Sequence, residues 1–304
     1  MMFQEIGLKV HSDSKVMNTK TSLLKVINQL QKKKSYHSYK TKKYREISEI
    51  LKNIIEDYYN NYNVNQSIAL GNICKIKFPL FSMGAINSKH LFGIDEIIIF
   101  CFYFLNKSKY KNVFDLGSNI GLHSLILSKL NYRVFSYEPD TVHFNQQIKN
   151  LKLNNQLKKV KLYKKAVSNS KGKVKFLKVL GNTTGNHIYG DKKKVYGKTK
   201  IISVQTENFK KIISNSDLIK IDVEGHEAEL ILSTSSSDWK KTDAIVEVGN
   251  KMSGKKIFDH CIKNNLNIFS QMSGWKRVKS NINMPNNHKK GSIFITKKNK
   301  MNWR

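Results

Sequence analysis

The stretch VFDLGSNIGLHS, residues 113–124, predicts the start of an α/β nucleotide-type pocket. It has the pattern of a buried strand, a glycine-rich turn and the beginning of a helix. A second strand pattern, VFSYEP at residues 134–139, ends in the acid Glu138. Glycines in such a turn let the backbone approach a ligand closely, and a helix N-terminus offers free N–H groups. We therefore expect a ligand pocket where these two strands end.

The spacing within the turn differs from that of two common nucleotide motifs. From Asp115 to Gly121 the turn reads D-x-G-x-N-x-G, whereas the dinucleotide fingerprint is G-x-G-x-x-G. The chain has no G-x-x-x-x-G-K-[ST] segment, so a P-loop is excluded. Glu138 stands where an acid accepts ribose hydroxyls in dinucleotide folds. An acid at Asp115 for an amino group, without a basic group for a pyrophosphate, suits S-adenosylmethionine.

Four segments together resemble the FkbM family of S-adenosylmethionine-dependent methyltransferases. These segments are VFDLGSNIGLHS, SYEPD at 136–140, AVSNSKGKVKF at 166–176 and LIKIDVEGHEAELI at 218–231. The resemblance implies a methyltransferase that acts mostly on hydroxyl groups of sugars or other secondary metabolites, often in polysaccharide biosynthesis. It also implies cofactor contacts by Asp115, Gly117, Ser118, Asn119, Gly121, Glu138, Pro139, Ala166 and Val167. Ser118 departs from the family pattern, which often has alanine there.

Strand and helix patterns alternate along the chain and predict a sheet covered on both faces. The expected strands are 112–116, 133–137, 160–167, 218–222, 244–248, 267–271 and 292–296. An antiparallel pair, 173–179 with 199–205, surrounds a glycine-rich loop. We predict the α/β fold of a class I methyltransferase: a Rossmann-like, doubly wound, mainly parallel sheet with an antiparallel last strand. A helical N-terminal extension at 1–66 would precede the methyltransferase domain at 67–304.

Acidic residues follow the predicted strand at 218–222 and are candidates for catalysis. Methyl transfer needs an in-line arrangement, and a sugar hydroxyl reacts more easily when a base removes its proton. The candidate catalytic residues are Asp222, Glu224 and His226. Alternatively, Asp222 caps the following turn, and His226 is an ordinary residue at a helix start. Asp222 and Glu224 could instead hold Mg²⁺, an alternative that we do not favour because so few carboxylates lie nearby.

Candidate acceptor-binding residues lie on neighbouring segments of the chain. The loop GNTTGNHIYG, residues 181–190, carries short hydrogen-bonding side chains that suit sugar hydroxyls. Composition alone favours an ordinary exposed hairpin loop, and the position of the segment after the third strand makes the two interpretations about equal. Glu247 ends a predicted strand at the same edge, where it would bind the acceptor or form an ion pair. The candidate substrate residues are His123, Thr184, His187 and Glu247.

The formal net charge of +32 comes almost entirely from lysine. Nucleic-acid grooves favour arginine forks, but only four arginines occur, namely Arg45, Arg133, Arg277 and Arg304. We therefore expect a solvated lysine surface without specific nucleic-acid binding. RNA or protein methylation guided by this surface is the alternative function, and a non-catalytic binding module is the third.

Cysteine spacing and hydropathy bear on the cellular compartment. Cys74, Cys101 and Cys261 are scattered, so neither a disulfide framework nor a zinc site is expected. The first fifteen residues lack the apolar region of a secretory signal. The longest apolar run, 97–105, is too short to span a bilayer. We expect a cytoplasmic enzyme with a small-molecule or glycan acceptor and no transmembrane segment.

Overall fold

An eight-stranded sheet forms the centre of the molecule, in the order β13-β12-β14-β11-β10-β3-β4-β5. Its strands are β3 Asn112–Leu116, β4 Arg133–Tyr137, β5 Val160–Tyr163, β10 Leu218–Ile221, β11 Asp243–Val246, β12 Asn267–Ser270, β13 Lys276–Arg277 and β14 Ile293–Thr296. The five strands from β5 to β11 pair in parallel. The last strand, β14, is antiparallel to both neighbours. This order confirms the predicted doubly wound sheet with an antiparallel last strand.

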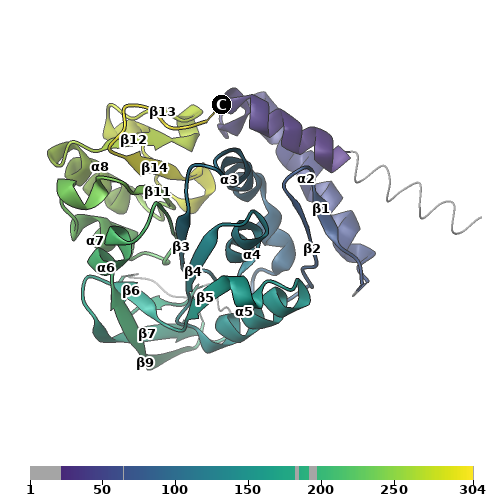
Figure 1. The fold of residues 1–304 in the computed structure, drawn as a ribbon, viewed down its shortest axis with the longest axis horizontal. Helices are drawn as coiled ribbons and strands as arrows, with labels where there is room; N and C mark the ends of the chain where they lie inside the picture. The colour runs from purple at the N-terminus through teal and green to yellow at the C-terminus, as the bar shows by residue number, and fades with distance from the viewer. Residues whose placement is uncertain (1–21, 64, 182–184, 192–196, 304) are drawn as a thin grey trace, which may run out of the picture.

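The computed structural model describes residues 22–63, 65–181, 185–191 and 197–303. Helices cover both faces of the sheet, with α3, α4 and α5 on one side and α6, α7 and α8 on the other (Figure 1). The α-helices are 22–32, α2 Lys42–Asn60, α3 Ile94–Leu105, α4 Leu122–Lys129, α5 Thr141–Leu153, α6 Phe209–Ser214, α7 Glu227–Leu232 and α8 Lys251–Lys263. In this part of the chain, no helix combines the length and apolar character needed to cross a membrane.

Side chains of the central strands alternate between two cores, as the period of a β-strand requires. Val113 packs into the core under α3 and α4, whereas Phe114 packs into the core under α6, α7 and α8. The same alternation places Leu218 and Ile219 in opposite cores. Because both faces are covered, the parallel strands are apolar almost throughout. Polar residues at their ends therefore stand out.

A second sheet of four strands, in the order β6-β9-β7-β8, lies beside β5 (Figure 1). Its strands are β6 Ala166–Ser168, β7 Gly172–Val179, β8 His187–Ile188 and β9 Thr199–Asn208. The antiparallel pairing of β7 with β9 confirms the predicted pair. The expectation of one strand over 160–167 is wrong, because its two halves belong to different sheets. The Tyr163 carbonyl accepts from the N–H groups of Glu138 and Lys165, which ends the ladder and turns the chain.

The N-terminal helices pack against the α3–α4 side of the main sheet. Ile27 and Leu30 of the first helix are fully buried in the same core as α3. Trp303 stacks on Trp275 at 6.0 Å and meets His37 edge-on at 4.4 Å. A short hairpin follows these helices, made of β1 Ile68–Leu70 and β2 Cys74–Ile76. The division into domains at 66/67 stays a prediction.

Candidate active site

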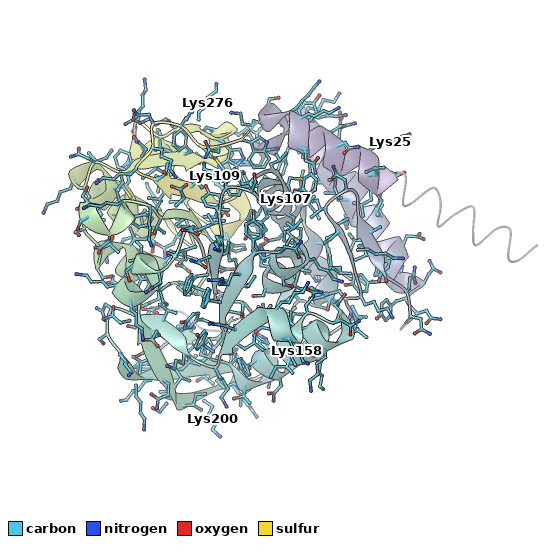
Figure 2. The ribbon with its side chains drawn as sticks, in the orientation of Figure 1. Lys25, Lys107, Lys109, Lys158, Lys200 and Lys276 are labelled. Carbon is cyan, nitrogen blue, oxygen red and sulfur yellow. The ribbon has the colours of Figure 1, made fainter. Side chains whose placement is uncertain are left out.

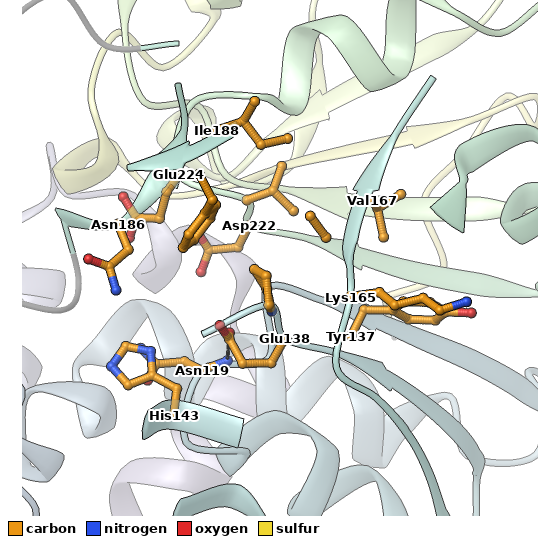
Figure 3. A pocket seen from close by; sticks show the side chains of 15 residues that line it. Asn119, Tyr137, Glu138, His143, Lys165, Val167, Asn186, Ile188, Asp222 and Glu224 are labelled. Carbon is orange, nitrogen blue, oxygen red and sulfur yellow. Dashed lines mark hydrogen bonds between the residues drawn. The ribbon is translucent and has the colours of Figure 1, made fainter. Parts of the chain in front are cut away.

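A cavity opens at the carboxyl ends of β3, β4 and β10, between the main sheet and the second sheet. It is open to solvent, and its empty space, open solvent included, amounts to about 610 Å³. It is lined by Gly117, Asn119, Tyr137, Glu138, Pro139, His143, Lys165, Ala166, Val167, Phe176, Asn186, Ile188, Asp222, Val223 and Glu224 (Figure 3). β4 lies on one side of β3 and β10 on the other, so the cavity sits where the winding of the sheet reverses. This is the expected ligand position in an open α/β sheet.

The glycine turn after β3 forms the floor of the cavity. Gly117 has φ +73°, and a Cβ there would lie 1.7 Å from the carbonyl oxygen of Asp222. No other residue type fits that position without moving the backbone. Asn119 also has positive φ, at +52°, a conformation that asparagine tolerates better than most residues. The turn therefore brings the ends of β3 and β10 into direct backbone contact.

Glu138 is held rigidly at the end of β4. Its Oε2 accepts from the Asn119 N–H at 2.8 Å, and its Oε1 accepts from the Asp140 N–H at 2.8 Å. Its side chain is almost fully buried yet lines the cavity. Burial raises the pKa of Glu138 to about 8, against the lowering effect of the two N–H groups. Each oxygen keeps a lone pair for a hydrogen-bond donor within the cavity.

The second sheet supplies an apolar wall and part of the roof. Val167 on β6, Phe176 on β7 and Ile188 on β8 line the cavity (Figure 3). Asn186 ties this roof to the N-terminus of α5, because its Nδ2 donates to Oδ2 of the capping residue Asp140 at 3.1 Å. Its Oδ1 accepts from the Val179 N–H at 2.7 Å. The cavity thus has one flat apolar side and one polar end.

Charged side chains line the cavity where β10 ends. Asp222 follows β10, and its Oδ2 lies 2.9 Å from the Lys220 ammonium. Burial disfavours the ionised form, but the Lys220 charge and a hydrogen bond with Glu247 outweigh it, so the pKa of Asp222 lies below its usual range. Burial and the neighbouring Asp222 raise the pKa of Glu247 well above its usual range. Glu247 therefore holds the proton of the pair and donates to Asp222.

The remaining residues of the DVEGHE segment shape the loop after β10. Glu224 lines the cavity and has φ +57°. Glu227 faces inward, where its carboxylate accepts from the N–H groups of Val223 and Gly225 at 3.0 Å. Burial raises the pKa of Glu227 to about 7. His226 is not among the residues that line the cavity, and its Nδ1 lies 3.1 Å from Asp191.

Comparison with known protein families gives one match over just over half of the chain. The sequence model of the methyltransferase FkbM domain matches residues 115–269. The chain belongs to the FkbM methyltransferase family. This confirms the resemblance and the class of enzyme, a methyltransferase of the type that uses S-adenosylmethionine. No curated protein matches the sequence.

Solved structures with a similar fold include methyltransferases of several kinds. An FkbM methyltransferase from Methylobacillus flagellatus KT is 13% identical, with 61% of this chain and 43% of that chain aligned and a TM-score of 0.39. The StiE O-MT, residues 942–1257, is 11% identical, with coverages of 56% and 53% and a TM-score of 0.32. Monomeric WbdD is 11% identical, with coverages of 67% and 40% and a TM-score of 0.37. This chain therefore spans about half the length of the first structures it matches, and these TM-scores carry no argument about its acceptor.

Several residues predicted for the cofactor site of this FkbM protein do not line the cavity but contact residues beside it. Asp115 is fully buried on β3, where its Oδ2 accepts from Ser124 Oγ at 2.7 Å. Ser118 donates to Gln147 Oε1 at 3.2 Å. A Cβ on Gly121 would lie 2.4 Å from the Gln147 side chain. The structure thus brings Gly117, Asn119, Glu138, Pro139, Ala166 and Val167 to the cavity, and it places Asp115, Ser118 and Gly121 outside its lining.

The predicted acceptor residues are dispersed. His123 is buried between Glu96 Oε2, at 2.7 Å from its Nε2, and the Tyr103 hydroxyl, at 3.0 Å from its Nδ1. His187 is buried, with Nδ1 2.7 Å from the Gly185 carbonyl oxygen. Neither histidine lines the cavity. Thr184 lies outside the described residues. Glu247 reaches the site through its hydrogen bond with Asp222.

Among the residues of the site that were not predicted from sequence are His143 and Lys220. His143 lines the cavity, and Lys220 contacts Asp222. A lysine in an otherwise apolar strand, LIKI, is the signal that could have identified Lys220. His143 gives no comparable signal, because its position depends on how α5 packs beside the cavity. Asn186, which also lines the cavity, belongs to the predicted acceptor loop 181–190.

Proposed function

We propose that this FkbM protein transfers a methyl group from S-adenosylmethionine to a hydroxyl of a saccharide or glycolipid precursor. The observation that supports this most directly is the polarity of the cavity. The rigid carboxylate of Glu138 and the ionised Asp222 both line it, after β4 and β10 respectively. Val167, Phe176 and Ile188 give it an apolar side, and this combination suits an adenosine that carries a sulfonium.

The residues present fit this cofactor. Glu138 would accept the ribose hydroxyls with the lone pairs that its backbone contacts leave free. Gly117 and Asn119 would let the backbone approach the methionine part, because Gly117 has no side chain in the way. Ala166, Val167 and Pro139 would lie against the adenine. When bound, S-adenosylmethionine supplies an electrophilic methyl group on a sulfonium.

The acidic end would position the acceptor and take its proton. Asp222 is ionised, and its side chain is 25% exposed, so an acceptor hydroxyl can reach it. As the oxygen attacks the methyl carbon, its proton would pass to Asp222 or to Glu224, which also lines the cavity. His226 would act indirectly, since Asp191 and Ser168 hold its ring beside the loop that carries both acids.

The net charge of +32 supports a second candidate, methylation of RNA or protein. Figure 2 shows labelled lysines on several sides of the molecule, among them Lys25, Lys158 and Lys276. A nucleic-acid footprint normally gathers on one face or along one groove. The scattered arrangement therefore favours the saccharide acceptor. We also propose a cytoplasmic location, which the free thiols of Cys74, Cys101 and Cys261 support.

Incubation with labelled S-adenosylmethionine and a panel of glycans and glycolipid precursors tests the first proposal. Label should enter a glycan fraction and should be lost with Asp222→Asn. Transfer to RNA or protein, with steep inhibition by salt, would replace it with the second candidate. Parallel reactions with EDTA test the Mg²⁺ alternative. Within the described residues, no three histidine, cysteine or acidic side chains are arranged to hold a metal ion.

A further inference from the structure

A buried lysine stands in the middle of the main sheet. Lys220 lies on β10 and is only 7% exposed. It pairs directly with Asp115 on β3. Both side chains point toward α3 and α4, because Val113 and Leu218, two residues earlier on each strand, lie in the core on that side. An ammonium group so deep in a sheet must be compensated by other charges.

Two carboxylates compensate this ammonium. Its Nζ lies 2.9 Å from Asp222 Oδ2 and 3.9 Å from Asp115 Oδ1. Burial disfavours its charge, but these carboxylates outweigh that effect and raise the pKa of Lys220. Glu247 adds no charge while it holds the proton that it donates to Asp222. The three ionised groups therefore sum to one negative charge at the edge of the cavity.

Several further titratable groups surround this centre, and three of them contact one another. The groups that face it from neighbouring elements are Glu96 and Tyr103 on α3, Asp115 on β3, His123 on α4, Glu224 after β10 and Glu247 after β11. Glu96 contacts His123, which in turn contacts the Tyr103 hydroxyl. Lys220 is thus the cation that lies in direct contact with Asp222 in the described structure.

We propose that Lys220 is a positioning residue of the methyl-transfer centre. It fixes the Asp222 carboxylate at the cavity edge and offsets the negative charge of Asp222 and Asp115. With this charge balance, the centre binds the sulfonium cofactor and its neutral thioether product with similar affinity. The inference rests on the proposed use of S-adenosylmethionine.

The physical reason is the loss of charge during the reaction. Methyl transfer breaks the bond between carbon and sulfur and leaves the electron pair on sulfur, so the sulfonium becomes a neutral thioether. An uncompensated pair of carboxylates would stabilise the cation before the reaction more than in the transition state, where that charge is disappearing. Lys220 offsets this preferential stabilisation of the cation before the reaction. It also prevents a large difference between the affinities for the cofactor and for its product.

Calorimetric titration with S-adenosylmethionine and S-adenosylhomocysteine tests the inference without an acceptor. The quantity measured is the ratio of the dissociation constant of the thioether to that of the sulfonium. Lys220→Met should raise this ratio about tenfold, because the site gains a net negative charge. Asp222→Asn should lower it. The double variant Lys220→Met/Asp222→Asn should return it to within about threefold of the wild type.

Lys255→Met is a matched control, because Lys255 is exposed and pairs with Asp259 on the surface of α8. It should leave the ratio unchanged. A folded Lys220→Met variant with an unchanged ratio would overturn the inference. If that variant does not fold, an unchanged ratio in Asp222→Asn and in the double variant would overturn it equally. Failure of the wild type to bind either compound would instead reject the proposed function.

Discussion

Two aspartates at opposite ends of the parallel strands, one buried and one partly exposed, differ in how fully they are bonded. Asp243 begins β11 and is 1% exposed. It accepts from Tyr110 Oη at 2.7 Å, Thr296 Oγ1 at 2.6 Å and Lys298 Nζ at 2.8 Å. Asp222 follows β10, and its side chain is 25% exposed. It has Lys220 and Glu247 as partners and leaves part of its carboxylate toward the cavity.

The difference separates a carboxylate that stabilises the fold from one that is available for chemistry. Both lie beside an apolar strand and near a lysine, so their sequence surroundings look alike. At the amino end of the strands, every hydrogen bond that the Asp243 carboxylate accepts comes from another part of the protein. At the carboxyl end, where ligands bind in open α/β sheets, the Asp222 carboxylate can still accept a hydrogen bond. The following experiments test this division.

The largest effect is expected from substitution of Asp243, at the amino end of the strands. Asp243→Asn should lower the free energy of unfolding by about 3 kcal/mol, because the amide cannot accept from all three buried or half-buried donors. Denaturant unfolding measures the loss. Affinity for S-adenosylmethionine should stay within about twofold, since the residue is remote from the cavity. A large loss of affinity in a folded variant would contradict a purely structural role.

The second-largest effect is expected when a methyl group is added at the floor of the cavity, and it concerns cofactor binding. Gly117→Ala places a Cβ 1.7 Å from the Asp222 carbonyl oxygen, at a backbone φ of +73°. The ends of β3 and β10 must then separate, and we expect affinity for S-adenosylmethionine to fall about 100-fold. Gly249→Ala is the control, because a Cβ there meets no atom within 4 Å. Equal effects of the two substitutions would argue against the assigned cavity.

Glu138 should couple cofactor binding to proton release. The pKa of Glu138 is about 8 before ligand binds, whereas ribose hydroxyls donate to its ionised form. Binding therefore lowers this pKa and releases a proton near pH 7, so affinity should rise with pH up to about 8 and then level off. Calorimetry in buffers with different ionisation enthalpies measures this release. Glu138→Gln should abolish it and weaken binding about tenfold; proton release that persists in this variant would assign the effect to another group.

The smallest effect is expected from the corresponding substitution of Asp222, at the carboxyl end of the strands. Asp222→Asn should change the free energy of unfolding by about 1 kcal/mol or less. Asp115 still faces the Lys220 ammonium, so the lysine keeps one carboxylate partner. Denaturant unfolding beside Asp243→Asn gives the direct comparison. A loss as large as that of Asp243→Asn would show that both aspartates are structural.

Much of the main sheet could be predicted from the sequence. The strands at 112–116 and 133–137 match β3 and β4 residue for residue, because apolar runs bounded by glycine and proline have clear ends. The split of 160–167 into two sheets could not be predicted. The bend involves a local bond from the Lys165 N–H to the Tyr163 carbonyl and a second bond to that carbonyl from the Glu138 N–H, which exists only once β4 and β5 are paired.

The candidate site shows the same limit. The motifs identified Glu138 and Asp222 because chemistry restricts the residue type at a strand end. They also indicated Asp115 and His123, whose side chains turn out to be bonded to Ser124 and Glu96 behind the cavity. Sequence spacing shows that a residue lies near a turn, but not whether its side chain points to a ligand or to the next helix.

The positions of β14 and Trp303 in the fold have a consequence for how the chain folds during its synthesis. The final strand, β14, lies between β11 and β12, and Trp303 packs against His37 and donates to the Gln31 carbonyl. A nascent chain therefore cannot close its sheet, or cover its first helix, until residues near 303 have left the ribosome. Until that moment the Phe102 and Trp275 rings lack the Trp303 ring that packs on them, and this apolar surface is where we expect chaperones to bind the growing polypeptide.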